Sequence, residues 1–360
     1  PFVGFATFAT DVIGRHAWQL VAAASTTDAK LRGSLRYSYA GLGTPVLSLF
    51  ADQSWDGYGP LTGRSASGRV DTLFVRERDR NVQLAATFPL SRFRRSTSLT
   101  LSAGLAAEDS ELLDSNADPT TAYRMDALRS RLADVRASLG VSTARGHAFS
   151  ISAEEGAALS LQGRVRRHLR LADSLEARAG ADRSFSEGTG RLRLYQPLRA
   201  LGLRRHVIAL RASGGAAGGP GADRFHFDVG GGTTHFFPVR GYANGERAGR
   251  LAWSATAEYR FPIVRVNRGW GLIPIHLDQV SGAFFADAGN AWGPELDAAL
   301  PRYQNPVRTA LGSAGAELAA DLLTFFTVSF PLRGGVAFPL TAATRGGTSP
   351  RWYMSLGSSF

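Results

Sequence analysis

The chain has 360 residues, 41 basic and 30 acidic side chains, a formal net charge of +11 and no cysteine. Without cysteine it can form no disulfide framework, no thiolate zinc site and no cysteine nucleophile. Its 41 glycines and 44% hydrophobic residues exclude the composition of a disordered chain, and its length suits roughly two domains or one large all-β domain.

The hydropathy excludes a membrane protein built of helices. The longest stretch without a charged side chain is Tyr37–Ala51, which has 15 residues and contains Pro45, whereas a spanning helix needs about 20. The arginines are spread along the whole chain and Lys30 is the only lysine, so the basic charge does not form a nucleic-acid patch. No signal peptide follows Pro1, so we expect a mature product or a fragment whose upstream part is missing.

Alternation with a period of two runs along the chain. In segments 98–108, 251–261 and 352–360, apolar residues alternate with small or polar ones, which indicates strands because successive side chains of a strand point to opposite faces. The segments are about ten residues long and their polar faces carry many arginines and glycines, a pattern typical of a transmembrane β-barrel, apolar outside and polar inside. A large soluble β-sandwich is the alternative.

The pattern predicts an all-β fold, a 16-stranded antiparallel transmembrane β-barrel. The expected strands are 2–10, 15–25, 31–40, 45–52, 69–78, 81–89, 97–108, 127–141, 146–155, 189–198, 204–214, 250–261, 279–288, 312–322, 327–339 and 351–360. His168–Gly180 also alternates in part and is an alternative to the tenth strand, or an addition to it. Because no linker divides the chain, residues 1–360 are predicted to be one outer-membrane barrel domain, with any upstream domain absent from this sequence.

The connections between the expected strands differ in length. Ser25–Lys30 and Pro89–Arg95 are short and are expected on one side of the membrane. Asp109–Tyr123 and Gly215–Gly249 are long and are expected on the other side. The longest connection begins in the glycine-rich run Gly214–Gly221, which is too short to link two domains.

The longest loop contains Val239, Arg240, Gly241 and Tyr242, preceded by the glycines 230–232. This VRGY sequence resembles the motif in the sixth extracellular loop of the BamA/TamA-type outer-membrane assembly factors. Further segments match that family in order and spacing across residues 230–360: Glu258–Pro262; the FxDxGxxW segment with Phe285, Asp287, Gly289 and Trp292; Gly312–Leu318; Pro331–Arg333; and a final strand ending in Phe360. The first 230 residues match only as a pattern of strands.

Two carboxylates and one arginine are the candidate site. Glu258 and Asp287 lie on the polar faces of their strands, so both are expected to point into the lumen. A guanidinium can pair bidentately with carboxylates, and Gly241 allows close backbone approach. The resemblance implies that Arg240 pairs with both carboxylates and that the loop is folded into the lumen. The alternative is a solvated Arg240, with the acids paired to other lumen arginines such as Arg260.

The carboxyl-terminal strand has a second interpretation. Trp352, Met354, Leu356 and Phe360 resemble the signal by which the assembly machinery recognises outer-membrane substrates. Ser358 departs from it, since a hydrophobic residue is usual there. An ordinary final strand with an interfacial aromatic explains the same residues, and the two interpretations are compatible.

The resemblance implies an assembly factor that inserts or folds other outer-membrane proteins at a seam between its first and last strands, here 2–10 and 351–360. The alternatives are a polypeptide-translocating pore of the two-partner-secretion type, or a barrel that anchors an upstream enzyme or propeller domain. The implied location is the outer membrane of a Gram-negative bacterium. The expected partners are outer-membrane lipid, client polypeptides and periplasmic accessory proteins, without nucleic acid.

We expect no enzymatic activity. The sequence contains no GxSxG, HExxH or Walker motif, and its seven histidines are scattered without metal-ligand spacing. No catalytic residue, metal or cofactor is therefore predicted.

Overall fold

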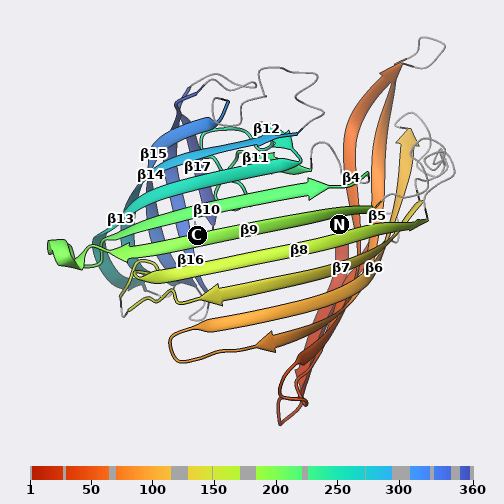
Figure 1. Ribbon diagram of the computed structural model, residues 1–360, viewed down its shortest axis with the longest axis horizontal. Helices are drawn as coiled ribbons and strands as arrows, with labels where there is room; N and C mark the ends of the chain where they lie inside the picture. The colour runs from red at the N-terminus through yellow and green to blue at the C-terminus, as the bar shows by residue number, and fades with distance from the viewer. Residues whose placement is uncertain are drawn as a thin grey trace.

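The computed structural model describes residues 2–26, 30–64, 70–114, 129–147, 149–170, 184–220, 226–271, 273–293, 309–324, 328–341 and 349–356. The described residues form one antiparallel sheet of 15 strands and a separate two-stranded sheet (Figure 1). The helical element in this part of the chain is a single 3₁₀ turn, η1 (Arg199–Leu201). The described ranges contain no helix long and apolar enough to span a membrane.

The strands of the large sheet follow one another in chain order. Their bounds are β1 (Phe2–Thr10), β2 (His16–Ser25), β3 (Leu31–Tyr39), β4 (Val46–Arg64), β5 (Val70–Pro89), β6 (Ser96–Asp114), β7 (Arg129–Ser142), β8 (Gly156–Arg170), β9 (Ser184–Pro197), β10 (Val207–Gly218), β13 (Leu251–Trp270), β14 (Ile273–Trp292), β15 (Leu311–Thr324), β16 (Val328–Pro339) and β17 (Arg351–Leu356). The small sheet pairs β11 (Phe227–Val229) with β12 (Arg247–Gly249).

The loop between β10 and β13 packs on one face of the large sheet and so distinguishes the two faces. It carries β11 and β12, which contact β13 and β14, and Figure 1 shows both loop strands beside the curved sheet. We call the face on which this loop packs the inner face, and the opposite one the outer face. Because paired residues of neighbouring strands lie on the same face, the register assigns the residues of the other strands to the inner or the outer face.

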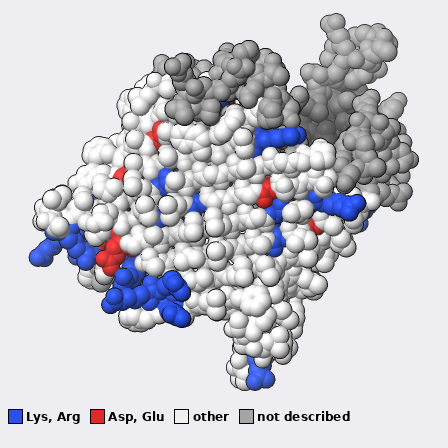
Figure 2. Space-filling view, viewed as in Figure 1, with Lys and Arg blue, Asp and Glu red and all other residues white. Residues whose placement is uncertain are grey.

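The two faces have the reverse of the polarity found in a soluble protein. On the outer face Leu84, Leu105 and Val135 are 63%, 59% and 59% exposed, and most of the surface seen in Figure 2 carries no charge. On the inner face the charged side chains Asp134 and Glu258 are buried. Apolar side chains exposed and charged ones buried are typical of a barrel in lipid, and they argue against the soluble sandwich.

The sheet has two edges. Within the described residues, β1 pairs only with β2 and β17 only with β16, so the expected seam between 2–10 and 351–360 is not formed. Because neighbouring strands are antiparallel and fifteen is odd, β1 and β17 run in the same direction. A strand antiparallel to both would be needed to join them into a wholly antiparallel cylinder.

A single long strand, β5, replaces the two strands predicted at 69–78 and 81–89. Arg80 is paired with Gln53 of β4 and with Ala107 of β6, and both ladders continue through it. The two predicted strands left Asp79 and Arg80 as a turn between them. This segment stays in the sheet because Asp109 on β6 binds Arg78 and Arg80 across the strands.

The merged strand also corrects the orientation of the first strands. Removing one predicted strand reverses the direction of every strand before it. The connection 26–30 therefore lies at the same end of the sheet as the long loop 219–250, and only the turn 90–95 lies at the opposite end. The prediction that both short turns share one side was wrong.

Three further boundaries differ from the predicted ones. The predicted strand 146–155 is an irregular connection, and the next strand, β8, begins at Gly156, where φ is +98°. The predicted tenth strand corresponds to β9, whereas His168 belongs to β8 and residues 171–183 lie outside the described ranges. Gly214 continues β10, paired with β9 and β13, and does not begin the loop.

Candidate functional site

The long loop has a hydrophobic core of its own on the inner face. Phe227, Val229, Phe237, Val239 and Tyr242 from the loop pack with Ala252, Ala291 and Leu311 from the wall. Phe227 and Phe237 meet edge to face, with ring centroids 5.4 Å apart, a favourable geometry for aromatic pairs. This burial fixes the path of the loop and brings the residue after Val239 against the sheet.

Two glycines allow the close approach. Gly289 on β14 faces the loop, and a Cβ there would lie 2.9 Å from Val239 Cγ2 and 2.9 Å from the backbone oxygen of Trp253. Gly241 has φ of +89°, a conformation that L side chains rarely adopt, and a Cβ there would lie 3.1 Å from Ala337 Cβ. The loop can touch the wall because both positions lack a side chain.

Arg240 is bound to Asp287 by three hydrogen bonds. Its Nε donates to Asp287 Oδ2 at 2.7 Å and its Nη2 donates to Oδ1 at 2.8 Å. Its backbone N–H donates to Oδ2 at 3.0 Å. Both side chains are 0% exposed. The carboxylate therefore fixes both the side chain and the backbone of Arg240, which is the bidentate arrangement with one additional donor.

Arg240 also contacts two further carboxylates and an aromatic ring. Its Nη1 lies 2.8 Å from Glu258 Oε1 and 3.6 Å from Glu317 Oε2, and its guanidinium carbon lies 3.5 Å from the centre of the Phe285 ring. Burial by itself lowers the pKa of Arg240, but the charges of Asp287 and Glu258 outweigh it and raise that pKa. The guanidinium therefore stays charged although it is excluded from water.

A second set of side chains satisfies the same carboxylates. Arg260 donates to Glu258 Oε2 from Nε at 2.9 Å and from Nη2 at 2.8 Å. Arg333 Nη1 donates to Glu317 Oε1 at 2.6 Å, and Tyr353 OH donates to Glu317 Oε2 at 2.8 Å. Arg240, Arg260 and Arg333 thus share the three carboxylates Asp287, Glu258 and Glu317, and each buried negative charge has a cationic partner.

Tyr242 fastens the loop at a second point. Its hydroxyl lies 2.8 Å from the backbone oxygens of Gly312 and Thr341, and it accepts a hydrogen bond from the Thr341 backbone N–H at 3.2 Å. Trp292, the last residue of the predicted FxDxGxxW segment, ends β14 and pairs with Leu251. The structure therefore assembles Val239, Arg240, Tyr242, Glu258 and Asp287 in one region, while Trp292 marks the end of its wall.

The carboxyl-terminal residues lie elsewhere. Trp352, Met354 and Leu356 point to the outer face and are 83%, 76% and 64% exposed. Phe360 and Ser358 lie outside the described residues. Tyr353, which lies between Trp352 and Met354, points to the inner face and bonds to Glu317. One face of β17 is therefore apolar and exposed, and the other contacts the Arg240 network.

Sequence reasoning missed Glu317, Arg333 and Tyr353 as members of the network. Glu317 lies within the segment Gly312–Leu318 that matched the family pattern, and alternation alone would have placed it on the same face as the other acids. Arg333 and Tyr353 gave no such signal, because many arginines and aromatics alternate in this chain. Their partners are decided by which strands become neighbours.

A separate ion-pair cluster occupies the inner face of β5–β9. Arg164 and Arg166 bind Asp134, the latter from Nε at 3.0 Å, and Arg164 also lies 3.6 Å from Glu187. Asp134, Arg164 and Arg166 border a polar cavity of about 170 Å³. The inner wall is thus covered by the loop at β13–β17 and lined by charged side chains at β5–β9.

The arrangement around Arg240 holds a loop in place. The guanidinium is fully enclosed and its hydrogen bonds go to carboxylates of the wall, and Glu317 extends the contacts to β16 and β17. Breaking such a buried pair is costly because one charge is left without its partner. The network therefore couples the position of the loop to five consecutive strands, β13 to β17.

A family model described as the Omp85 superfamily domain matches residues 31–360, while no curated protein matches the chain. Among solved structures, BamA from Haemophilus ducreyi lacking POTRA domains 1–3 is similar with a TM-score of 0.51 and 14% identity, over 99% of this chain and 69% of that one. CdiB from Escherichia coli is similar with a TM-score of 0.57 and 11% identity, over 99% of this chain and 59% of that one.

CdiB from Acinetobacter baumannii is similar with a TM-score of 0.56 and 15% identity, over 99% of this chain and 56% of that one. The chain thus spans between 56% and 69% of these three proteins, and at such identities the likeness concerns the fold alone. The family match is broader, since it includes the buried loop and all strands from β3 onward. On this evidence the chain belongs to the Omp85 superfamily.

Proposed function

We propose that this chain is the outer-membrane β-barrel of an assembly factor, and that an incoming strand of a client polypeptide pairs with the free edge of its sheet. The observation that carries the proposal is the pair of edges at β1 and β17, which run in the same direction. A sixteenth strand antiparallel to both would close the barrel with an even strand number. An edge with unpaired backbone groups is a template for strand addition.

The composition of β1 supports this role. Phe5 and Phe8 are 59% and 82% exposed on this edge strand, and Gly4 lies within it. A glycine in a strand weakens the pairing of that strand. The opposite edge is held differently, because Tyr353 of β17 is bonded to Glu317 in the Arg240 network. One edge is thus anchored to the rigid part of the wall while the other is free to exchange partners.

Site-specific cross-linking tests the proposal, and the absence of native cysteine makes each introduced cysteine report one position. The protein with Thr7→Cys in β1 is reconstituted in liposomes and supplied with a client barrel protein carrying a cysteine in its last strand. We expect a disulfide between them during insertion. The matched control is Ala212→Cys, on the outer face of the internal strand β10, where no cross-link is expected.

A second candidate is a pore of the two-partner-secretion type, and the charged inner face around Asp134 and its cavity favours it. Gln83 lies on the inner face of β5, so a polypeptide passing through the lumen would form a cross-link with the cysteine of the variant Gln83→Cys. Cross-links at Gln83 without cross-links at Thr7 would replace the first proposal with this one. A barrel that only anchors an upstream domain would give neither.

The remaining parts of the proposal follow from the same role. The protein would reside in the outer membrane of a Gram-negative bacterium, with membrane lipid, client polypeptides and periplasmic accessory proteins as partners. Residues 1–360 would act as one barrel domain. The chain itself would perform no enzymatic reaction and need no cofactor.

A further inference from the structure

A group of cations on the outer face lies apart from the Arg240 network. Arg78 and Arg80 of β5 bind Asp109 Oδ2 of β6 from their Nη2 atoms, at 2.7 and 2.6 Å. Arg131 of β7 binds Asp109 Oδ1 from Nη1 at 3.0 Å. Asp109 is 8% exposed, whereas the arginine side chains are 33%, 39% and 37% exposed. Three guanidinium groups on one carboxylate leave an excess of two positive charges at the surface.

The group lies where the apolar outer wall ends. Along β5 the outward residues Val82 and Leu84, both at least half exposed, are followed by Arg80 and Arg78. Along β7 the outward Val135 is likewise followed by Arg131 in the direction of the strand's first residue, Arg129. In each case the cation is on the side of the long loop 219–250. The transition from apolar to basic marks the level of the lipid headgroups.

The position of an aromatic side chain, Trp55, also indicates that these cations lie at the level of the lipid headgroups. The guanidinium of Arg78 lies 5.3 Å from the ring centre of Trp55 on β4, and Lys30 Nζ lies 4.5 Å from it. Arg32 Nη2 donates to the backbone oxygen of Trp55 at 2.7 Å. Tryptophan concentrates at the boundary between hydrocarbon and headgroups, so Trp55 and Arg78 belong to one interfacial belt.

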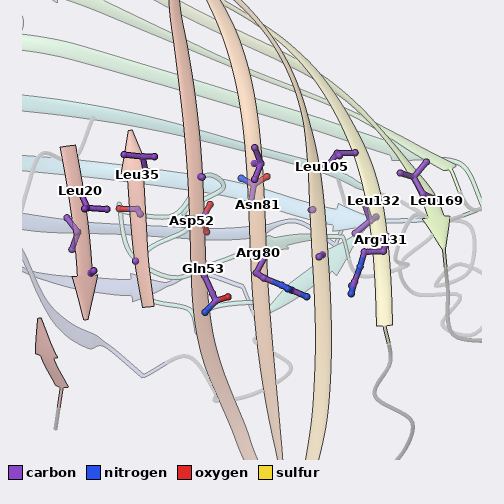
Figure 3. Close-up of a pocket in the computed structure, with 18 residues that line it drawn as sticks. Leu20, Leu35, Asp52, Gln53, Arg80, Asn81, Leu105, Arg131, Leu132 and Leu169 are labelled. Atoms are coloured by element: carbon purple, nitrogen blue, oxygen red, sulfur yellow. The ribbon is translucent and has the colours of Figure 1, made fainter. Parts of the chain in front are cut away.

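A groove runs from this belt along the apolar wall. It has a volume of about 800 Å³, and its outward-facing lining includes Leu20, Leu35, Val82, Leu105, Arg80 and Arg131. Figure 3 shows the side chains of Arg80 and Arg131 extending toward one another from their two strands. The groove therefore offers an apolar floor for an acyl chain and two converging cations at one end.

We propose that this surface binds a phosphate-bearing lipid of the membrane leaflet on the side of the long loop, with the phosphate held between Arg80 and Arg131 and an acyl chain in the groove. A guanidinium forms forked hydrogen bonds with phosphate oxygens, and each arginine keeps donors that Asp109 does not use. The charge excess and the adjoining apolar groove select a lipid phosphate over a free one. This site is independent of the proposed role in assembly.

Native mass spectrometry of the purified protein in detergent tests the site, with bisphosphorylated lipid A as probe and the same glycolipid without phosphates as comparison. We expect the wild type to bind the phosphorylated form and the triple variant Arg78→Gln, Arg80→Gln, Arg131→Gln to bind it at least about tenfold more weakly. The control is Arg92→Gln, Arg94→Gln, Arg95→Gln, which removes the same charge from the exposed turn at the opposite end of β5 and β6 and is expected to bind as wild type.

A second variant, which keeps all three arginines, tests the proposal even if the triple variant fails to fold. Asp109→Asn removes the competing carboxylate, so we expect it to bind the phosphorylated lipid at least as tightly as the wild type. Equal binding of the two glycolipids, equal weakening in the control, weaker binding by Asp109→Asn, or displacement of the lipid by excess inorganic phosphate would each overturn the proposal.

Discussion

Among the described residues, Arg240 is the largest side chain that is fully buried. It is fully enclosed, and each of its charged contacts is a carboxylate of the wall: Asp287 through three hydrogen bonds, Glu258 at 2.8 Å and Glu317 at 3.6 Å. A charge in such a place is stable only while its partners are present. The loop and the wall therefore have to be disrupted together.

A double-mutant cycle measures this coupling. Arg240→Ala and Asp287→Ala are each expected to lower the free energy of unfolding by about 3–5 kcal/mol, because each leaves a buried charge unpaired. The double variant should lose clearly less than the sum of the two. Urea unfolding in detergent, followed by tryptophan fluorescence, gives the three values. Additive losses would show that the two residues are not coupled, and Arg240→Ala combined with the distant Glu154→Ala serves as the additive control.

The contact between loop and wall depends on Gly289 in the same way. An added Cβ there would lie 2.9 Å from Val239 and from the backbone of Trp253, so Gly289→Ala should push the loop away. We expect faster protease cleavage within residues 226–250, measured as fragment formation over time. Gly163→Ala on β8 is the matched control, since a Cβ at that position meets nothing within 4 Å. Unchanged cleavage in Gly289→Ala would contradict the proposed packing.

At this scale the sequence alone predicted part of the site. Alternation placed Glu258 and Asp287 on the inner face, and the resemblance added Arg240 as their partner. The participation of Arg333 and Tyr353 could not be predicted, because alternation gives the face of a residue and not its neighbours across strands. Arg260 shows the same limit: it binds Glu258 as the alternative expected, but it does so alongside an Arg240 that is fully buried and not solvated.

At the scale of elements, side-chain partners decide where strands begin and end. The run around Arg80 continues β5 because Asp109 lies across from it on β6. In the connection 143–155, Glu154 instead turns inward: its Oε2 accepts from Arg199 Nη2 at 2.5 Å, and its Oε1 accepts from the Ser150 hydroxyl at 2.7 Å. This ties the β7–β8 connection to the β9–β10 connection at the end of the sheet opposite the long loop.

This tie predicts a dependence of stability on pH. Burial raises the pKa of Glu154, but the hydrogen bonds from Arg199 and Ser150 outweigh it and hold that pKa below its ordinary value. The contribution of Glu154 to stability is therefore present above the ordinary pKa of a glutamate and is lost as the pH falls through the lowered value. The wild type should exceed Glu154→Gln in thermal stability at pH 6, and the difference should shrink as the pH falls below about 4. A difference that stays constant would contradict this assignment.

At the scale of the whole molecule, the distribution of polarity identifies a membrane barrel. Exposed leucines on the outer face and buried ion pairs on the inner face are stable only when lipid covers the outside. The formal charge of +11 is compatible with this, because many arginines are paired on the inner face and others, such as Arg80 and Arg131, lie in the outer belt.

A gel-mobility assay tests the barrel as a whole. We expect the unheated protein in detergent to migrate differently from the boiled protein, because a folded barrel binds less detergent and stays compact. Boiling should abolish the difference, and Arg240→Ala should lower the temperature at which it disappears. Identical migration of unheated and boiled wild type would contradict a folded barrel.

The sequence by itself determined the all-β class, the inner and outer faces, and the inward position of Glu258 and Asp287, because a period of two depends only on the geometry of a strand. It did not determine the number of strands or their direction. A charged run is compatible with a turn or with a strand, and only the cross-strand carboxylate Asp109 decided in favour of one long β5. Likewise, only the tertiary structure decided that β1 and β17 leave two edges, since strand pairing is a contact between residues far apart in the chain.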